Sequence, residues 1–275
     1  MEFINFLSFK RSRKIVLLCP GWEKGEKVAF YSPHDDDAVL GAGYLIMATL
    51  KSGGIPHIYI FCKGDAGYST LGEKKDIVKR RKEEAVRSYG LLGVPGKNVH
   101  FFDIPDFSLM GRLDRRLPQG KGVFDKIIST LRAEQISRAV FSSGYLEHWD
   151  HTAVFNAGVY LSSQAQDPIL VDLGKPFPMK TYLTYSVWGD LEPAPISRDE
   201  IRADLGIIAT PQEENRVLEA IKAFSSQNRI ILDIVAHREK RRSEEGYLEL
   251  YKSVPIRKPI NYAPYFHLLN RMKKQ

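Results

Sequence analysis

The stretch "KVAFYSPHDDDAVLGAG", Lys27 to Gly43, decides the fold class of this 275-residue chain. Its first six residues form a short run rich in apolar and aromatic side chains, which predicts a strand. From Ala38 the composition favours a helix, which the glycine pair Gly53 and Gly54 can end. One histidine and three consecutive aspartates stand between the two. Adjacent carboxylates repel each other and are costly to bury without a cation, so this turn indicates a bound metal ion.

Further strand and helix patterns alternate along the chain. Runs rich in β-branched and aromatic residues predict four more strands, at 57–62, 98–103, 137–142 and 181–186. Helical spacing of apolar residues predicts helices at 38–54, 75–93, 122–134, 151–165 and 210–227. Such alternation is typical of a parallel sheet with right-handed crossovers and helices on both faces. We therefore predict an α/β fold whose mostly parallel sheet carries the active site at the carboxyl ends of its strands.

The alternation loosens after about residue 187. We expect a single α/β domain over residues 1–275, with residues 1–26 as an N-terminal extension and about 187–275 as a C-terminal, substrate-side region. In the helix predicted at 210–227, Thr210 is the expected N-cap and Pro211 lies in the first turn. The charged run at 238–245 predicts a solvated face.

Composition limits the class of protein. Hydrophobic residues make up 43% and charged residues 27% of the chain, which is typical of one large soluble globular domain. The net charge of +7 favours an anionic ligand, but the bases form no stripe with interleaved aromatics, so we expect no nucleic-acid partner. The first apolar run ends at Pro20, too early for a signal peptide or a transmembrane segment. Cys19 and Cys62 stand alone in apolar contexts and are expected to be buried free thiols, which predicts a cytoplasmic location.

A second polar cluster follows another predicted strand. The segment "YLEHWDHTAVFNAG" places His148, Asp150 and His151 just after the strand at 137–142. Together with the first cluster, His34, Asp37 and His151 supply two imidazoles and one carboxylate, a set suited to zinc with an open coordination position. The alternatives are a solvated capping turn for the aspartates and a surface helix start for the histidines.

The remaining histidines are weaker ligand candidates. His57 and His100 fall within predicted strands. His237 and His267 have no acidic residue or histidine at ligand spacing. A metal site is therefore predicted only where the first two clusters meet.

These motifs resemble those of the PIG-L/LmbE-like zinc N-deacetylases, which remove acetyl groups from compounds that contain N-acetylglucosamine. The family's first motif is similar to "HDDDAVLGAG" at 34–43, and its later motif is similar to "HWDHTAV" at 148–154. Weaker similarities to family segments occur at "KGDAG" (63–67), "RKEEA" (81–85), "DIPD" (103–106) and "AIKAFSSQ" (220–227). The resemblance implies a Rossmann-like sheet, in agreement with the predicted alternation.

The resemblance also implies roles for individual residues. One zinc ion per chain would be bound by His34, Asp37 and His151, with Asp36 as the general base. His148, as an imidazolium, would stabilise the oxyanion, with Asp150 as its orienting partner. Contacts to the sugar or to an anionic group would come from Arg81 and Asp106, although Arg81 could instead pair with Glu84 or Glu73.

Two residues depart from the family motif. Asp35 replaces a proline and Ala38 replaces a glutamate. The added carboxylate at Asp35 could raise the pKa of Asp36 or compete for the metal, and the lost glutamate removes an outer support. The predicted ligand positions are unaffected by either change.

The sequence thus predicts a zinc-dependent hydrolase that removes an N-acetyl group from an N-acetylglucosamine-type amino sugar or its conjugate and releases acetate. The substrate is expected to be a small molecule or a glycoconjugate. The basic segment at 74–87 leads to the further hypothesis that the substrate carries an anionic group, through Arg81 or a neighbour. One alternative is a metal-dependent phosphoesterase, because clustered Asp and His also bind paired metals. Another is a catalytically altered, carbohydrate-binding relative. The sequence leaves the oligomeric state open.

Overall fold

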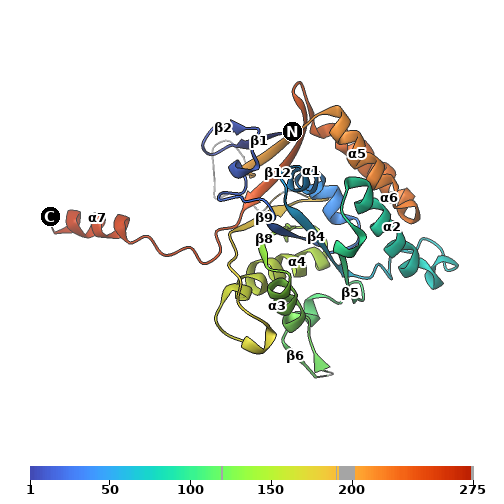
Figure 1. Cartoon of the computed structure of the whole chain (residues 1–275), viewed down its shortest axis with the longest axis horizontal. Helices are drawn as coiled ribbons and strands as arrows, with labels where there is room; N and C mark the ends of the chain where they lie inside the picture. Colours follow the sequence, from blue (N-terminus) through green and yellow to red (C-terminus); the bar gives the residue numbers. More distant parts are fainter. Residues whose placement is uncertain (119, 190, 192–201, 274–275) are drawn as a thin grey trace.

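The structure is a computed structural model that describes residues 1–118, 120–189, 191 and 202–273. Its centre is a 10-stranded sheet in the order β2-β1-β10-β12-β9-β8-β3-β4-β5, with β11 paired to β12. Helices flank this sheet, and the chain ends in an arm that projects from the body (Figure 1). The sheet therefore has a parallel half, which ends at β5, and an antiparallel half, which ends at β2.

The parallel half is the part that the sequence predicts. Its strands are β9 (Thr181–Tyr185), β8 (Ile136–Ser142), β3 (Lys27–Ser32), β4 (Ile55–Cys62) and β5 (Val99–Ile104). Each is parallel to its neighbours in this order. All five predicted strands match these within two residues at either end. The predicted α/β fold with a mostly parallel core is therefore confirmed.

Strand β3 lies in the middle of the parallel half and is buried on both faces. Phe30 is in register with Ile58 of β4 on one side and with Val140 of β8 on the other. Phe30 belongs to one apolar cluster and Tyr31, the next residue, to a second cluster on the opposite face. This explains why β3 has a continuous apolar run and not an alternating pattern.

Helices cover both faces of the sheet, as predicted. The first cluster includes residues of α1 (Asp37–Lys51), α2 (Ile77–Leu92), α5 (Pro211–Lys222) and α6 (Asn228–Arg238). The second includes residues of α3 (Phe124–Ala133) and α4 (Trp149–Asn156). Cys19 and Cys62 are buried and free, as predicted.

The antiparallel half was not predicted. It contains β12 (Gly246–Ser253), β10 (Leu205–Ala209), β1 (Glu2–Asn5), β2 (Lys10–Ser12) and the short β11 (Arg242–Ser243). Phe3 of β1 pairs with Ile207 of β10, about 200 residues later in the chain. The N-terminal extension and the C-terminal region therefore extend the central sheet.

Several local predictions can be compared with the structure. Thr210 caps α5, accepting a hydrogen bond from the Glu213 N–H in a reciprocal capping box, and Pro211 occupies the first helical position, as predicted. The helix predicted at 151–165 lies within a continuous helical stretch, but its type changes: α4 ends at Asn156 and is followed directly by a π turn and a 3-10 helix. Gly158 lies in that π turn, so close to the Phe141 ring that a Cβ would come within 2.4 Å of it.

The charged run at 238–245 is not wholly solvated. Arg238 is 2% exposed and its guanidinium makes two hydrogen bonds with the Glu214 carboxylate. The prediction of a solvated face is therefore wrong at Arg238. A small hairpin of β6 (Arg116–Leu117) and β7 (Gly120–Lys121) stands apart from the main sheet. Within the described ranges, every helix is too short or too polar to cross a bilayer.

Candidate metal centre and active site

The first part of the site is the turn between β3 and α1. The Ser32 hydroxyl donates to the His34 carbonyl and accepts from the Ala38 N–H at 3.0 Å. The His34 N–H donates to Asp37 Oδ2 at 2.7 Å. These bonds close the turn, so the side chains of His34 and Asp37 stand at the start of α1. Free N–H groups at a helix start favour carboxylates, which helps the turn to hold its aspartates.

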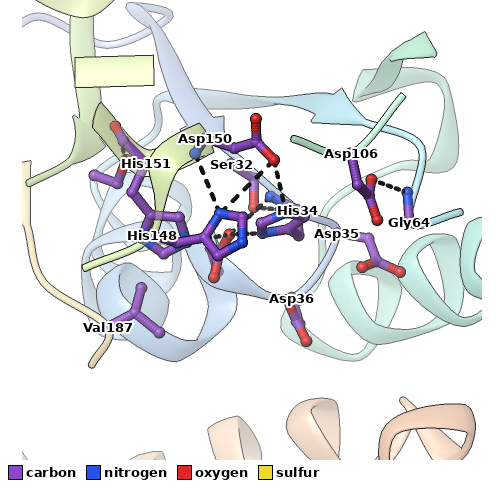
Figure 2. A network of polar contacts seen from close by, with 12 residues as sticks. Ser32, His34, Asp35, Asp36, Gly64, Asp106, His148, Asp150, His151 and Val187 are labelled. Carbon is purple, nitrogen blue, oxygen red and sulfur yellow. Dashed lines mark hydrogen bonds and ion pairs between the residues drawn. The ribbon is translucent and has the colours of Figure 1, made fainter. Parts of the chain in front are cut away.

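The second part is the turn between β8 and α4. His148 is the N-cap of α4, and its Nδ1 accepts from the Asp150 N–H at 3.1 Å. Asp150 and His151 lie in the first turn and are 0% and 1% exposed. Because β8 and β3 are adjacent parallel strands, both turns lie at the same edge of the sheet, and their side chains converge (Figure 2).

The predicted metal ligands lie together. Asp37 Oδ2 is 3.2 Å from His34 Nδ1 and 3.2 Å from His151 Nε2. One donor atom from each of these three residues lies within 4.8 Å of the others. Such separations suit a tetrahedral ion with bonds of about 2.0–2.2 Å, and two imidazoles with one carboxylate are a donor set that zinc accepts. The residues present therefore fit the predicted metal.

Two overlapping combinations also bring donors together. Among the described residues, His34 is close to His148 and Asp150 in one, and to Cys62 and Asp106 in the other. All three combinations use His34. His34 Nε2 is 3.4 Å from Asp150 Oδ2, so Asp150 contacts the histidine on the side away from Asp37.

Glu147 is a part of the site that the sequence reasoning missed. Its Oε2 lies 2.6 Å from His151 Nδ1, and its side chain is fully buried. Its Oε1 accepts from the backbone N–H groups of Val187, Trp188 and Gly189 at 2.7–3.0 Å. The carboxylate therefore turns the His151 ring so that Nε2 faces Asp37, as an outer-sphere partner does in metal sites. The spacing of four residues between Glu147 and His151 was the available signal.

Arg81 has a partner that the sequence did not predict. Its Nε lies 2.8 Å and 2.9 Å from the two carboxylate oxygens of Asp35, and both residues are buried. Its Nη2 is 3.7 Å from Asp36 Oδ2. Glu73 instead accepts from the Ser69 and Thr70 N–H groups. The added carboxylate at position 35 thus binds Arg81 and lies beside Asp36.

Asp106 fastens the loop that covers Arg81. It accepts from the Gly64 N–H at 2.8 Å (Figure 2). It also accepts from the Ala66 N–H at 2.9 Å. Gly64 has a φ of +72°, and a Cβ there would lie 2.8 Å from Arg81 Cδ. At Gly67 a Cβ would lie 2.1 Å from Arg81 Nη1. Only glycine allows this loop to approach the guanidinium so closely.

The carboxyl groups of the first turn differ in acidity. Burial raises the pKa of Asp36 to about 7, against the opposing effect of Arg81 and with help from Asp35 and Asp37. Asp37 is buried too, but His151 and His34 hold its pKa well below the usual range. Asp36 is therefore able to gain and lose a proton near neutral pH, while Asp37 stays ionised.

The three histidines also differ. Burial opposes protonation of His34 and His151, but hydrogen bonds of His34 with Asp150 and Asp37 raise its pKa to about 10, and Asp37 raises that of His151 to about 9. Burial and the nearby His34 lower the pKa of His148. The prediction of a His148 imidazolium is therefore disfavoured. Because its Nδ1 accepts from the Asp150 N–H, a neutral His148 carries its proton on Nε2 and can donate it.

A cavity of about 350 Å³ lies next to this cluster. Val187 and Trp188, whose N–H groups bind Glu147, form one wall. Arg238 and Arg241 form another, and both donate to the carbonyl of Leu40, one turn after Asp37 in α1. Residues that line the cavity thus make hydrogen bonds to Glu147, which contacts His151, and to helix α1, which begins at Asp37.

Comparisons with known proteins agree with this geometry. The family model PIG-L, GlcNAc-PI de-N-acetylase, matches residues 29–161, which include both turns. None of the curated proteins matches the chain in sequence. Among solved structures, the N,N'-diacetylchitobiose deacetylase from Pyrococcus horikoshii is 21% identical with a TM-score of 0.63, and the match covers 84% of each chain.

Two further solved structures share the fold. The conserved protein TT1542 from Thermus thermophilus is 18% identical with a TM-score of 0.62, and the match covers 86% of this chain and 97% of that one. GalB, the 4-carboxy-2-hydroxymuconate hydratase from Pseudomonas putida, is 19% identical with a TM-score of 0.62, over 86% of this chain and 100% of that one. The fold therefore occurs in a deacetylase and in a hydratase. Both motifs lie inside the matched region, so residues 29–161 are similar to the PIG-L family.

Proposed function

We propose that this protein is a zinc-dependent N-deacetylase that hydrolyses the acetamide of an N-acetylglucosamine-type sugar or its conjugate. The observation that carries the proposal is the convergence of His34, Asp37 and His151. Asp36 directly precedes Asp37 and is the N-cap residue of the same helix. The family's description as GlcNAc-PI de-N-acetylase supports the same reaction class. A cytoplasmic location stays a prediction, which the buried free thiols of Cys19 and Cys62 support.

The first task of the chain is to hold the metal. His34 Nδ1, Asp37 Oδ2 and His151 Nε2 would be the ligands, and a set of three protein ligands would leave room for water or substrate at the ion. Glu147 and Asp150 would fix the two imidazole rings from behind. When bound, the ion would polarise the acetamide carbonyl and make a water molecule more acidic.

Proton transfer falls to Asp36. Its pKa of about 7 suits a group that takes a proton from water and later gives it away. In the reaction a C–O bond forms between water and the carbonyl carbon, and the C–N bond then breaks. Asp36 accepts the proton of the attacking water and returns it to the departing nitrogen. The second proton of the water also ends on the nitrogen, so the products are acetate and the protonated amine.

Charge also develops on the carbonyl oxygen as the C–O bond forms. The Nε2–H of a neutral His148 can donate to this oxygen, a contribution typically worth about 3–4 kcal/mol. Asp150 holds the ring through its N–H, which fixes both the orientation and the tautomer of His148. The oxyanion role predicted for His148 thus stays in the proposal, with a neutral donor in place of an imidazolium.

The substrate hypotheses need revision. Arg81 is bonded to Asp35 and covered by the loop at 64–67, so a structural role for Arg81 is better supported than direct contact with an anionic substrate. Asp106 likewise holds the loop by two backbone hydrogen bonds. The cavity beside Val187, with its wall of Arg238 and Arg241, is the better place for a substituent of the sugar.

A screen for acetate release tests the proposal. The zinc-loaded protein is incubated with N-acetylated amino sugars and their conjugates, and acetate and primary amine are both measured. We expect equal amounts of the two products, and a rate at least about 100-fold lower for Asp36→Asn. Release of phosphate from phosphomonoesters without acetate would favour the phosphoesterase alternative. Sugar binding without turnover, at the same affinity in Asp36→Asn, would favour the carbohydrate-binding alternative.

A further inference from the structure

The arm after β12 leaves the body of the protein. Val254 still donates its N–H to the Tyr182 carbonyl, and Ile256 packs partly against the second apolar cluster. Every residue from 257 to 273 is exposed. This arm ends in α7 (Ala263–Met272), which has no buried residue and projects away from the sheet and its helices (Figure 1).

One face of α7 is apolar. Tyr262, Tyr265, Phe266, Leu269 and Met272 recur at the spacing of one helical face, and each is 53–64% exposed. A helix as short as α7 is only marginally stable in water unless it packs its apolar face against something. The arm therefore requires a surface that the body of this chain does not provide in the described structure.

The charge of the arm indicates what kind of surface the apolar face of α7 binds. Residues 258–275 contain four bases, Lys258, Arg271, Lys273 and Lys274, and no acid. The other 257 residues contain 36 bases and 33 acids, so these 18 residues account for four of the seven net positive charges. Arg257, just before them, pairs with Asp167 of the body. The arm thus combines an apolar, aromatic face with a concentration of positive charge.

We propose that residues 258–275 bind the surface of a bilayer that contains anionic lipids, with α7 lying in the plane of the interface. Aromatic and aliphatic side chains insert at the level of the headgroups, while Lys and Arg contact the lipid phosphates. With 10 residues, α7 is about half the length needed to span a bilayer. This inference goes beyond the proposed function and does not depend on it.

A second copy of the chain is the competing occupant. Two arms paired about a twofold axis would bury their apolar faces against each other. They would also bring eight bases together, four from each copy, with no acid in either arm to offset them. Like-charge repulsion opposes that arrangement, whereas an anionic surface attracts every base. Charge therefore favours the lipid surface.

Cosedimentation with lipid vesicles tests the proposal. The full chain is mixed with phosphatidylcholine vesicles that either lack phosphatidylglycerol or contain about one third of it. We expect binding to the anionic vesicles at least about tenfold stronger than to neutral ones, and weaker as salt is added. The double substitution Phe266→Asp/Leu269→Asp should lower binding by at least about tenfold. Arg271→Gln and Lys273→Gln should each lower it by about fivefold.

Matched controls make the result decisive. Leu7→Asp changes an apolar side chain that is 74% exposed elsewhere on the protein, and should bind vesicles like the wild type. Acetate release from a small sugar in free solution should be the same in all these variants, which separates this proposal from the function of the site. Equal binding to both kinds of vesicle, no binding, or full binding by the double variant would overturn the proposal. A concentration-dependent dimer that the double variant abolishes, without vesicle binding, would assign α7 to a second copy.

Discussion

Two groups of histidines lie at opposite ends of the parallel strands. Of these two groups, the one at the carboxyl ends shares a close carboxylate, as the ligands of a metal ion would. At the carboxyl ends, His34 and His151 share Asp37 at 3.2 Å. At the amino ends, His57 Nδ1 of β4 lies 3.1 Å from His100 Nε2 of β5, and the two ring planes are nearly parallel. The acid beside that pair, Glu134, is 4.0 Å from His57 Nε2 and also lies near Lys27.

The supply of carboxylates explains the difference. Asp37, Asp150 and Glu147 raise the pKa values of His34 and His151 to about 10 and about 9, although burial opposes this. Burial alone dominates at the other end, where the pKa of His57 falls to about 4. Neighbouring carboxylates therefore explain why the cluster at His34 and His151 attracts cations, whereas the pair His57 and His100 stays neutral.

Cavity size alone would favour the amino ends of the strands as the ligand site, but it is a poorer criterion than the arrangement of charged groups. The cavity lined by His57 and His100 measures about 580 Å³, and the one beside Val187 about 350 Å³. The larger cavity lies at the amino ends of the strands, whereas ligands of open α/β sheets bind at the carboxyl ends. The arrangement of charged groups thus decides between the two places.

The largest expected effect contrasts His151→Ala with His57→Ala. Wild-type protein should retain about one zinc per chain after dialysis, His57→Ala the same, and His151→Ala close to none, because of these two histidines only His151 is in the proposed ligand set. Activity should fall by at least about 1,000-fold in His151→Ala. Elemental analysis and acetate release measure both quantities. Two metals per chain, or metal loss in His57→Ala alone, would reverse the comparison.

Asp36→Asn separates metal binding from proton transfer at the carboxyl ends. The metal content should stay at the wild-type level, while kcat falls by about 100- to 10,000-fold, because the amide cannot take the proton of the attacking water. Elemental analysis and steady-state kinetics on the same preparation check this. Loss of the metal would instead show that Asp36, and not Asp37, is the ligand.

Glu147→Gln tests the outer support of the metal site. The amide still accepts hydrogen bonds from Val187 and its neighbours, but it holds the His151 ring less firmly than a carboxylate does. Zinc affinity should fall by about 10- to 100-fold. Competition with a chelator of known affinity measures the change, with Glu134→Gln as the matched control beside His57. An unchanged affinity for Glu147→Gln would remove Glu147 from the site.

The smallest effect concerns stability at the amino ends. His57 has a pKa of about 4 when folded and 6.5 when unfolded, so between these values the unfolded chain binds more protons. Its contribution to stability is therefore complete above about pH 6.5 and is lost as the pH falls towards 4, by about 2 kcal/mol at pH 5. Urea unfolding at pH 7 and pH 5 should show a smaller decrease for His57→Asn than for the wild type. An equal decrease in both would assign the pH dependence to other groups.

Local patterns in the sequence were sufficient to predict the parallel core and the turns of the site. The strand at 27–32 and the cap at Thr210 depend on neighbouring residues, so a local pattern predicts them. The β1–β10 pairing joins residues about 200 positions apart, and the sequence pattern of neither strand indicates which strand it pairs with. The Asp35–Arg81 pair was missed for the same reason, since Arg81 reaches the turn from α2.

The charge state of His148 needed three-dimensional information of another kind. The sequence places it beside Asp150, which favours an imidazolium. In the fold, burial and the closeness of His34, with ring centroids 4.9 Å apart, lower its pKa instead. A spacing in the sequence therefore predicts which residues meet, while their burial decides which of them carry charge.

Anomalous scattering at the zinc absorption edge, from crystals of zinc-loaded protein, would locate the metal itself. We expect one strong peak per chain, within about 2.0–2.2 Å of His34 Nδ1, Asp37 Oδ2 and His151 Nε2. A peak between His57 and His100, or one held by His148 and Asp150 without Asp37 and His151, would contradict this expectation.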